Sequence, residues 1–239
     1  VAGGPADPPP EVVYTNVDTD LWRPTPAARR AQVRRAVGAA DDTPVVLYTA
    51  RMVDSKQPRV FAETVLALRR RGLRFVAVAV GDGPLLPWLR GFVADHGLDD
   101  TLVVLGPTPA DRLRELTGSA DVAFLPTRVE GIAMVAFEAM AGGLPVVSAD
   151  VGGMAELILP DCGTLIRPAD PAVEVGRYTE ALTDLLTRPD ACRRMGAAAL
   201  RRIHRHFQLT QMGDRLDALL RAAVDRTRYA PPAARPVPT

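Results

Sequence analysis

The sequence has few of the features that define several large classes of protein. Only two of its 239 residues are cysteines, Cys162 and Cys192, with no Cys-x-x-Cys pair beside them, so free thiols in a reducing compartment are the simplest interpretation. No apolar run reaches the roughly 18–20 residues of a membrane span. The Gly- and Pro-rich start does not resemble a signal peptide. We therefore expect a cytoplasmic protein.

An excess of charge of either sign is also lacking. Lys plus Arg number 29 and Asp plus Glu number 28, which leaves a formal net charge of +1. Such a chain has no global attraction for nucleic acid or anionic lipid, so we expect no nucleic-acid partner. An anionic ligand must be held by a local cluster of cations.

Lysine and asparagine are almost absent. Lys56 is the only lysine and Asn16 the only asparagine, beside abundant Ala, Arg, Pro and Gly. This bias is typical of GC-rich coding and favours a bacterial source. A single residue of a disfavoured type is informative, and both fall inside candidate motifs.

What the sequence does contain is an alternation of short apolar runs and helical patterns. Alternation of this kind predicts β-α-β units and a parallel sheet. The expected strands cover residues 45–49, 75–80, 102–105, 122–125, 145–148 and, more weakly, 164–166. The expected helices cover residues 59–71, 85–96, 110–117, 134–142, 173–186, 191–206 and 211–228.

These elements predict an α/β fold, a Rossmann-like three-layer parallel sheet of about six strands with helices on both faces and a helical C-terminal extension. We expect residues 1–12 to be a linker or tail, residues 13–228 to form one domain with a single core, and residues 229–239 to be a Pro-rich tail. Gly142 and Gly143 are expected to end the helix before them.

Polar clusters follow four of the predicted strands. Ligands bind beyond the carboxyl ends of parallel strands, because the loops there lead into helix N-termini with unpaired N–H groups. Arg51 and Lys56 bracket a turn after the first strand. They can converge on one anion, and a pyrophosphate suits the planar fork of Arg and the point charge of Lys. A solvated surface pair is the alternative, but the uniqueness of Lys56 favours binding.

The Gly-x-Gly that contains Gly83 follows the second strand. A tight turn and close backbone approach to a ligand explain it about equally well.

Glu130 and Glu138 flank the start of the helix after the fourth strand. Between them, the backbone N–H groups of Gly131, Ile132, Ala133, Met134 and Val135 can attract phosphate. A carboxylate that accepts two hydroxyl donors suits a ribose, which is the expected role of Glu138, whereas Glu130 would face the sugar. Internal capping or salt-bridging of Glu138 is the alternative, since a buried Glu among apolar residues needs a partner.

Residues 130–147 (EGIAMVAFEAMAGGLPVV) resemble the E-x7-E signature of the family 4, or group 1, retaining glycosyltransferases. The similarity extends from residues 14–18 (YTNVD) through residues 152–157 (GGMAEL) to the terminal helices. The resemblance implies a B-type fold of two Rossmann-like domains, of which this chain would be the C-terminal, donor-binding one.

The resemblance also implies roles for particular residues. Arg51 and Lys56 would clamp the diphosphate, Glu138 would hold the ribose, and Glu130 with the backbone of residues 132–135 would address the sugar and phosphates. The backbone from Leu105 to Thr108 would meet the base. Ile132 and Ala133 stand where the family commonly has an aromatic residue and a glycine, a departure that bears on the identity of the sugar.

The expected function is donor binding in a retaining glycosyltransferase, with Glu130, Arg51 and Lys56 as catalytic groups and no metal or other cofactor. Asp18-Thr19-Asp20 spells a D-x-D metal motif, but it precedes the sheet in a linker. A non-catalytic nucleotide-binding module, a nucleotide-sugar epimerase and an NAD-dependent oxidoreductase are the alternatives. The last is disfavoured because no G-x-G-x-x-G follows the first strand.

The expected partners are a nucleoside diphosphate sugar and an N-terminal acceptor-binding domain. The chain opens in a Pro- and Gly-rich segment, and its first strand already belongs to the unit with Arg51 and Lys56. We therefore expect half of an enzyme, inactive in transfer by itself. Any peripheral membrane contact would come through the missing half.

Overall fold

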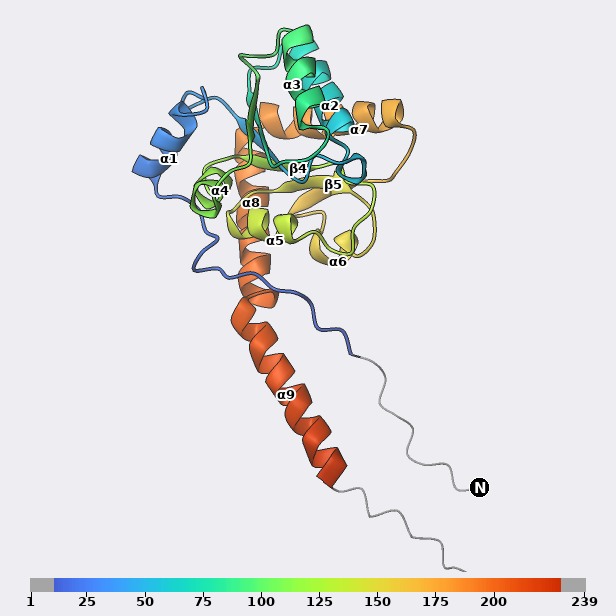
Figure 1. The fold of residues 1–239 in the computed structure, drawn as a ribbon. Helices are drawn as coiled ribbons and strands as arrows, with labels where there is room; N and C mark the ends of the chain where they lie inside the picture. The colour runs from blue at the N-terminus through green and yellow to red at the C-terminus, as the bar shows by residue number, and fades with distance from the viewer. Residues whose placement is uncertain (1–10, 229–239) are drawn as a thin grey trace, which may run out of the picture.

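A computed structural model of the chain describes residues 11–228. Of the predicted linker, only residues 11 and 12 fall within that range, and the predicted tail 229–239 lies wholly outside it. The described residues form the expected α/β fold, a six-stranded parallel sheet between layers of helices (Figure 1).

The strand order is β3-β2-β1-β4-β5-β6. The strands are β1 (Val45–Thr49), β2 (Val76–Val80), β3 (Leu102–Gly106), β4 (Val122–Leu125), β5 (Val146–Ala149) and β6 (Gly163–Ile166). The order runs outward in both directions from the β1–β4 pair, so the chain reverses its direction of travel across the sheet there. Ligands of open α/β sheets bind at such a reversal point.

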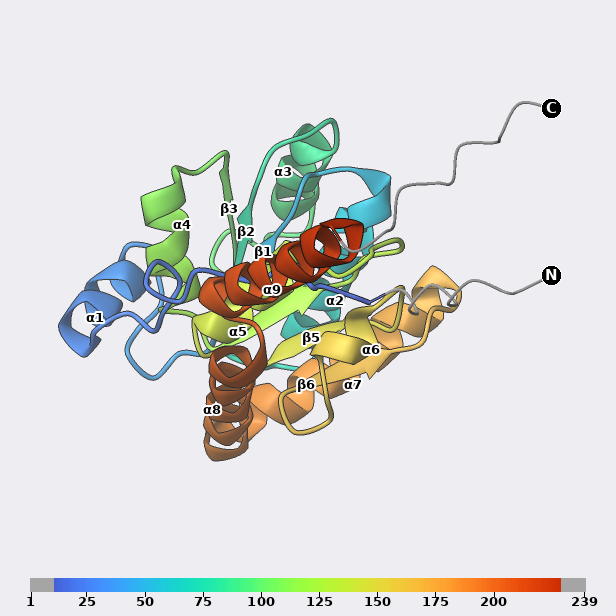
Figure 2. The same cartoon turned by 90° about the horizontal axis from the view of Figure 1, so that it is seen from below.

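Helices cover both faces of the sheet. They are α1 (Ala27–Arg35), α2 (Pro58–Arg70), α3 (Leu86–Asp95), α4 (Ala110–Thr117), α5 (Met134–Ala141), α6 (Met154–Leu157), α7 (Pro171–Thr187), α8 (Pro189–His206) and α9 (Leu209–Arg228), with a short 3-10 turn η1 (Asp54–Lys56). Figures 1 and 2 show α2, α3 and α7 on one face and α5 and α6 on the other. Of the helices predicted as a C-terminal extension, α7 and α8 pack on the domain and only α9 projects from it.

The sheet divides the interior into two apolar clusters, so the prediction of a single core was wrong. Val46 and Tyr48 of β1 pack with α2, α3 and α7, whereas Val45 and Leu47 belong to the cluster that contains α5 and α8. Successive side chains of a strand point to opposite faces, and a strand covered on both faces reads as a continuous apolar run. For that reason the apolar runs identified the strands correctly.

Helix α1 was not predicted, because its nine residues carry only one large apolar side chain, Val33. A polar anchor holds the helix instead. Arg34 is only 3% exposed; its guanidinium donates to the Asp121 carboxylate at 2.8 Å and to the Ser119 carbonyl at 3.0 Å. Buried charge is tolerated when it is paired and hydrogen-bonded in this way.

The start of the domain is tied to the junction of α8 and α9. The Val17 N–H donates to the Phe207 carbonyl and the Leu209 N–H donates to the Val17 carbonyl, each at 3.0 Å. Asn16, the only asparagine, donates from Nδ2 to the Gln208 carbonyl at 2.8 Å. Its role in the described residues is therefore structural.

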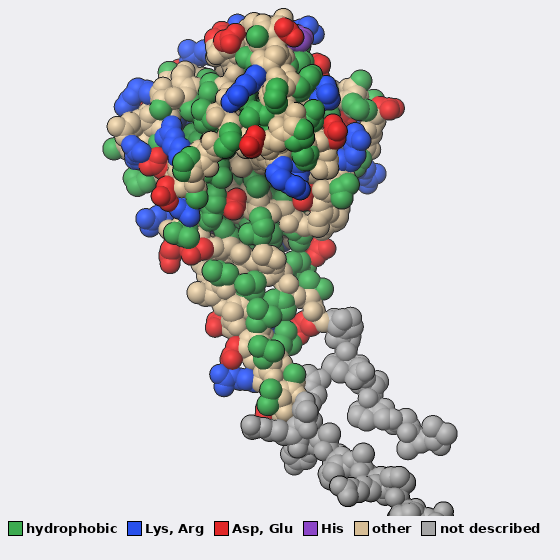
Figure 3. All heavy atoms as spheres, in the orientation of Figure 1, with side chains coloured by type: hydrophobic (Ala, Val, Ile, Leu, Met, Phe, Trp, Pro, Cys, Tyr) green, Lys and Arg blue, Asp and Glu red, His purple; other side chains and the backbone are tan. Residues whose placement is uncertain are grey.

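Helix α9 projects from the domain and carries exposed apolar side chains. They are Leu209, Leu216, Leu220 and Val224, and Figure 3 shows hydrophobic side chains along this projecting helix. Exposed apolar surface of this kind is typical of a contact surface. Within residues 11–228, no helix combines the length and the apolar character needed to cross a bilayer.

Candidate functional site

A cavity of about 250 Å³ opens beyond the carboxyl ends of β1 and β4, where the strand order reverses. It brings together six of the predicted site residues: Arg51, Lys56, Glu130, Ala133, Met134 and Val135. The remaining lining residues are Tyr48, Thr49, Ala50, Leu125 and Thr127. The convergence predicted from loop positions is thereby realised in one concave site.

Lys56 is fixed in this cavity from two sides. It ends the turn η1, and its ammonium forms an ion pair with the Glu130 carboxylate. The buried Tyr48 hydroxyl donates to the Lys56 carbonyl at 2.9 Å, which ties the turn to β1. Arg51 is exposed on the same wall and forms no ion pair within the described part of the chain. The cavity thus holds one paired and one unpaired cation.

The loop that carries Glu130 is held by its neighbours. The Thr127 hydroxyl lies 3.2 Å from the Ser55 carbonyl oxygen, and the Gly153 N–H donates to the Gly131 carbonyl at 2.6 Å. Gly152, at φ 54°, packs so closely that an added Cβ would collide with the Glu130 carbonyl oxygen. The loops after β1 and β5 therefore determine where Glu130 lies.

The first turn of α5 faces the cavity with unpaired donors. The Ala136 N–H donates to the Ala133 carbonyl at 2.9 Å, and Ala133 at the N-cap provides no side-chain cap. Among the described residues, nothing accepts a hydrogen bond from the N–H groups of Met134 and Val135. Free N–H groups at a helix N-terminus attract anions.

Glu138 lies beside the main cavity. It lines a small void of about 10 Å³ that shares Thr49, Leu125 and Val135 with the larger one. Burial raises the pKa of its carboxyl, and the charge of Arg114 opposes this shift. No residue in the range 11–228 forms a hydrogen bond or ion pair with that carboxylate. The alternative in which Glu138 caps or salt-bridges internally is therefore not observed, and the carboxylate is free to accept ligand hydroxyls.

Gly83, Leu105 and Thr108 lie along the same edge of the sheet but outside the cavity. An added Cβ at Gly83 would come within 2.7 Å of the Met52 carbonyl oxygen, so tight packing of two loops explains this glycine. Leu105 is on β3, two strands from β1 and thus roughly 10 Å away, and the Thr108 hydroxyl donates to the Gly106 carbonyl at 3.2 Å. Contact of these residues with a ligand stays a prediction.

Gly131 and Ile132 do not line the cavity either. Gly131 is exposed, whereas Ile132 is partly buried and packs beside Gly153. Contact of either residue with a ligand stays a prediction.

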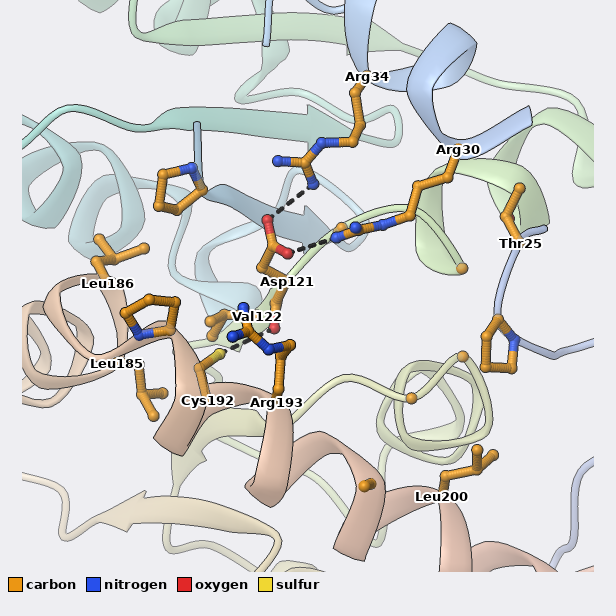
Figure 4. A pocket seen from close by; sticks show the side chains of 18 of the residues that line it. Thr25, Arg30, Arg34, Asp121, Val122, Leu185, Leu186, Cys192, Arg193 and Leu200 are labelled. Carbon is orange, nitrogen blue, oxygen red and sulfur yellow. Dashed lines mark hydrogen bonds and ion pairs between the residues drawn. The ribbon is translucent and has the colours of Figure 1, made fainter. Parts of the chain in front are cut away.

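A larger cavity of about 460 Å³ lies at the opposite edge of the sheet, beside the starts of β1 and β4 (Figure 4). Two of its cations are held by one carboxylate, since Arg30 and Arg34 both pair with Asp121, at 2.6 and 2.8 Å. The buried Cys192 thiol, whose pKa burial raises to about 11, donates to the Asp121 carbonyl at 3.4 Å. By volume this cavity would be the first candidate for a ligand-binding site. However, the unpaired cation and the unpaired helix N–H groups lie at the other edge of the sheet.

Residues 29–202 match the model of the family described as "Glycosyl transferases group 1", and this range is well over half of the chain. The chain belongs to the group 1 glycosyltransferases. The family resemblance predicted from the E-x7-E segment is thereby confirmed.

This group 1 chain is 34% identical, over 212 residues, to the GDP-mannose-dependent alpha-(1-6)-phosphatidylinositol monomannoside mannosyltransferase of Mycolicibacterium smegmatis; the match covers 85% of this chain and 54% of that protein. The chain spans about half the length of the curated relatives that it matches.

Solved structures share the fold of the group 1 chain. HepE of Anabaena, in complex with UDP-glucose, superposes with a TM-score of 0.78 at 20% identity over 89% of this chain and 57% of that one. The C-terminal domain of the group 1 protein LpcC of Francisella tularensis superposes with a TM-score of 0.69 at 19% identity, over 81% of this chain and 99% of that one. The predicted B-type, Rossmann-like architecture is confirmed.

Thr49 of the group 1 chain also lines the cavity of about 250 Å³, although the motifs in the sequence did not single it out. The Thr49 hydroxyl, at the end of β1, is buried without a partner among the described residues and lies between the two voids at this edge. A buried hydroxyl without a partner is costly, which makes it a candidate ligand contact. The signal in the sequence was the position of Thr49, a polar residue at the end of an otherwise largely apolar strand.

Proposed function

We propose that this chain binds a nucleoside diphosphate sugar and presents it for transfer of the glycosyl group to an acceptor hydroxyl, with retention of configuration. The observation that carries the proposal is the convergence of Arg51, Lys56 and the free N–H groups of α5 on one cavity at the reversal point of the sheet. These groups suit a diphosphate, since cations and helix N-termini both attract phosphate.

The role of each residue in the transfer reaction follows from where negative charge develops. In glycosyl transfer the bond between the anomeric carbon and the diphosphate oxygen breaks, the acceptor oxygen bonds to that carbon and releases its proton, and negative charge builds on the leaving diphosphate. Arg51, Lys56 and the start of α5 would stabilise that charge without reorganising. Glu130 would contact the sugar and Glu138 the ribose hydroxyls.

Membership of the group 1 family favours transfer over the epimerase and oxidoreductase alternatives. The base and the sugar are not decided by the similar proteins, because these include both a GDP-mannose-dependent mannosyltransferase and a structure in complex with UDP-glucose. We further propose that an acceptor-binding domain is supplied from outside this sequence. The cytoplasmic location and any membrane contact through that domain stay predictions.

Calorimetry on the 239-residue chain tests the donor assignment. Each nucleoside diphosphate is compared with its nucleoside, for each base, and one diphosphate is expected to bind at least tenfold more tightly than its nucleoside. If each nucleoside diphosphate bound no more tightly than its own nucleoside, for every base tested, the proposal would be overturned.

A transfer assay separates an enzyme from a non-catalytic module. The 239-residue chain is compared with a parent protein that also carries the proposed acceptor-binding domain, using the donor found by calorimetry and a panel of acceptors. Acceptor-dependent turnover is expected only with the parent, because positioning an acceptor is worth about 7–11 kcal/mol of the barrier. A parent that binds donor without turnover would favour the module instead.

A further inference from the structure

Gln57, which follows the only lysine, is the one non-glycine residue with positive φ within residues 11–228. Its φ of 51° and ψ of 52° are left-handed, a conformation that a Cβ disfavours. Gln57 connects the turn η1 to Pro58 at the start of α2. Strained residues of this kind persist where the surroundings determine them, and they cluster at functional sites.

The side chain of Gln57 is 6% exposed and its hydrogen-bonding groups are used. With the amide oriented so that donors face acceptors, the nitrogen donates to the Pro126 carbonyl at 3.0 Å and to Glu174 Oε2 at 3.1 Å. The oxygen accepts from Arg128 Nε at 3.2 Å. The amide therefore joins the loop after β1 to the loop after β4 and to α7.

These two loops carry the ion pair of the cavity. Lys56 immediately precedes Gln57, and Pro126 and Arg128 belong to the loop that leads to Glu130. A backbone hydrogen bond from the Arg128 N–H to the Ser55 carbonyl, at 2.8 Å, links the same two segments. Gln57 thus lies where the Lys56 turn and the Glu130 loop are held in register.

We propose that Gln57 is a positioning residue for the diphosphate site, an inference that rests on the proposed function. Its left-handed backbone directs the Lys56 turn toward the cavity, and its amide fixes the distance between that turn and the Glu130 loop. Glycine would accept the backbone conformation but would leave the buried Glu174 oxygen without this donor. Glutamate would set a second carboxylate beside Glu174, which is 4% exposed.

The test is Gln57→Gly in the 239-residue chain. Because Lys56 is the only lysine, lysine labelled with ¹⁵N gives a single side-chain ammonium signal for NMR, which needs no ligand. We expect this signal to move toward that of a solvated lysine. We also expect the preference for nucleoside diphosphate over nucleoside to fall at least tenfold, while nucleoside affinity changes less than twofold. Gln57→Gly added to Lys56→Ala should lower diphosphate affinity no further.

Thr64→Val is the matched control, since Thr64 is a fully buried residue of α2 whose hydroxyl donates to the Val60 carbonyl at 2.7 Å. It should lower the melting temperature and leave the Lys56 signal unchanged. Gln57→Asn, which tolerates left-handed backbone but has a shorter amide, replaces Gln57→Gly if that variant does not fold, and it should shift the signal in the same direction.

An unchanged Lys56 signal in a folded Gln57 variant, or losses that add to those of Lys56→Ala, would overturn the positioning role. Failure of the wild-type chain to prefer any diphosphate refutes the proposed function instead, so the two failures are distinguishable.

Discussion

Lys56 and Glu130, 74 residues apart in the sequence, form an ion pair at the wall of the cavity, with side chains 21% and 15% exposed. Removing one partner of a partly buried pair leaves the other charged in a site shielded from water, which is costly. An ammonium has three N–H donors, so Lys56 can keep Glu130 and still donate to a phosphate. The pair therefore holds the lysine in place before a donor arrives.

This pairing predicts different outcomes for its two members. Lys56→Ala should weaken binding of a nucleoside diphosphate about 10- to 100-fold, because a hydrogen bond to a charged group contributes about 1.5–3 kcal/mol, and should leave the nucleoside unaffected. Glu130→Gln removes a negative charge near the diphosphate but keeps a side-chain oxygen that can accept from Lys56, so diphosphate affinity should stay equal or rise. Calorimetry measures both, and equal weakening by the two variants would contradict the assignment.

Glu138→Gln tests the ribose contact. Because an amide accepts hydroxyl donors less strongly than a carboxylate, the variant should lose roughly tenfold in affinity for a ribonucleoside diphosphate. It should lose less than twofold for the 2′,3′-dideoxy analogue, which has no hydroxyl to donate. A parallel loss for both analogues would show that Glu138 serves the fold instead.

The same substitution has an expected effect on stability. Burial raises the pKa of the Glu138 carboxyl, so the folded chain favours the protonated form, and stability is lost as pH rises through the folded pKa. Glu138→Gln should therefore raise the melting temperature at neutral pH by about 1–3 °C, given that ~1 kcal/mol moves a domain of this size by about 2–4 °C. The difference should vanish below the ordinary Glu pKa of about 4.3. Melting curves across that range check this, and a pH-independent difference would refute it.

Gly152→Ala should displace the loop that carries Glu130. An added Cβ would collide with the Glu130 carbonyl oxygen, at a φ of 54° that strains any side chain, so the Glu130 loop must shift. We expect a loss of at least tenfold in donor affinity. Gly176→Ala on α7, where an added Cβ meets nothing within 4 Å, is the control and should bind normally. Normal donor binding by Gly152→Ala would show that the loop adapts freely.

Asp121→Ala should separate stability from binding. It leaves Arg34, whose side chain is 4% exposed, without its carboxylate at the edge of the sheet opposite the cavity. Breaking a buried pair costs about 3–5 kcal/mol, and because the Asp121 side chain is 25% exposed, we expect roughly 2–4 kcal/mol in chemical denaturation. Donor affinity of the folded variant should be unchanged. Weaker donor binding would mean that the two edges are coupled.

Local patterns were sufficient to predict much of this molecule. Strands β1 and β4 and helix α4 begin and end where the sequence predicted, because strands buried on both faces give uninterrupted apolar runs. The sequence patterns did not predict helices α1 and α6. The first is anchored by Arg34 rather than by an apolar face, and the second has four residues, so neither shows a clear helical period.

The sequence by itself determined the fold class and the family, and it predicted the residues of a diphosphate and a ribose site, since each depends on periodicity or on a motif within one segment. Tertiary structure decided which of those residues share a cavity. Lys56 meets Glu130 because β1 lies next to β4 in the sheet. It also decided that Gly83, Leu105 and Thr108 lie outside that cavity. Strand order is set by packing between distant segments, and no local pattern encodes the distance between two loops.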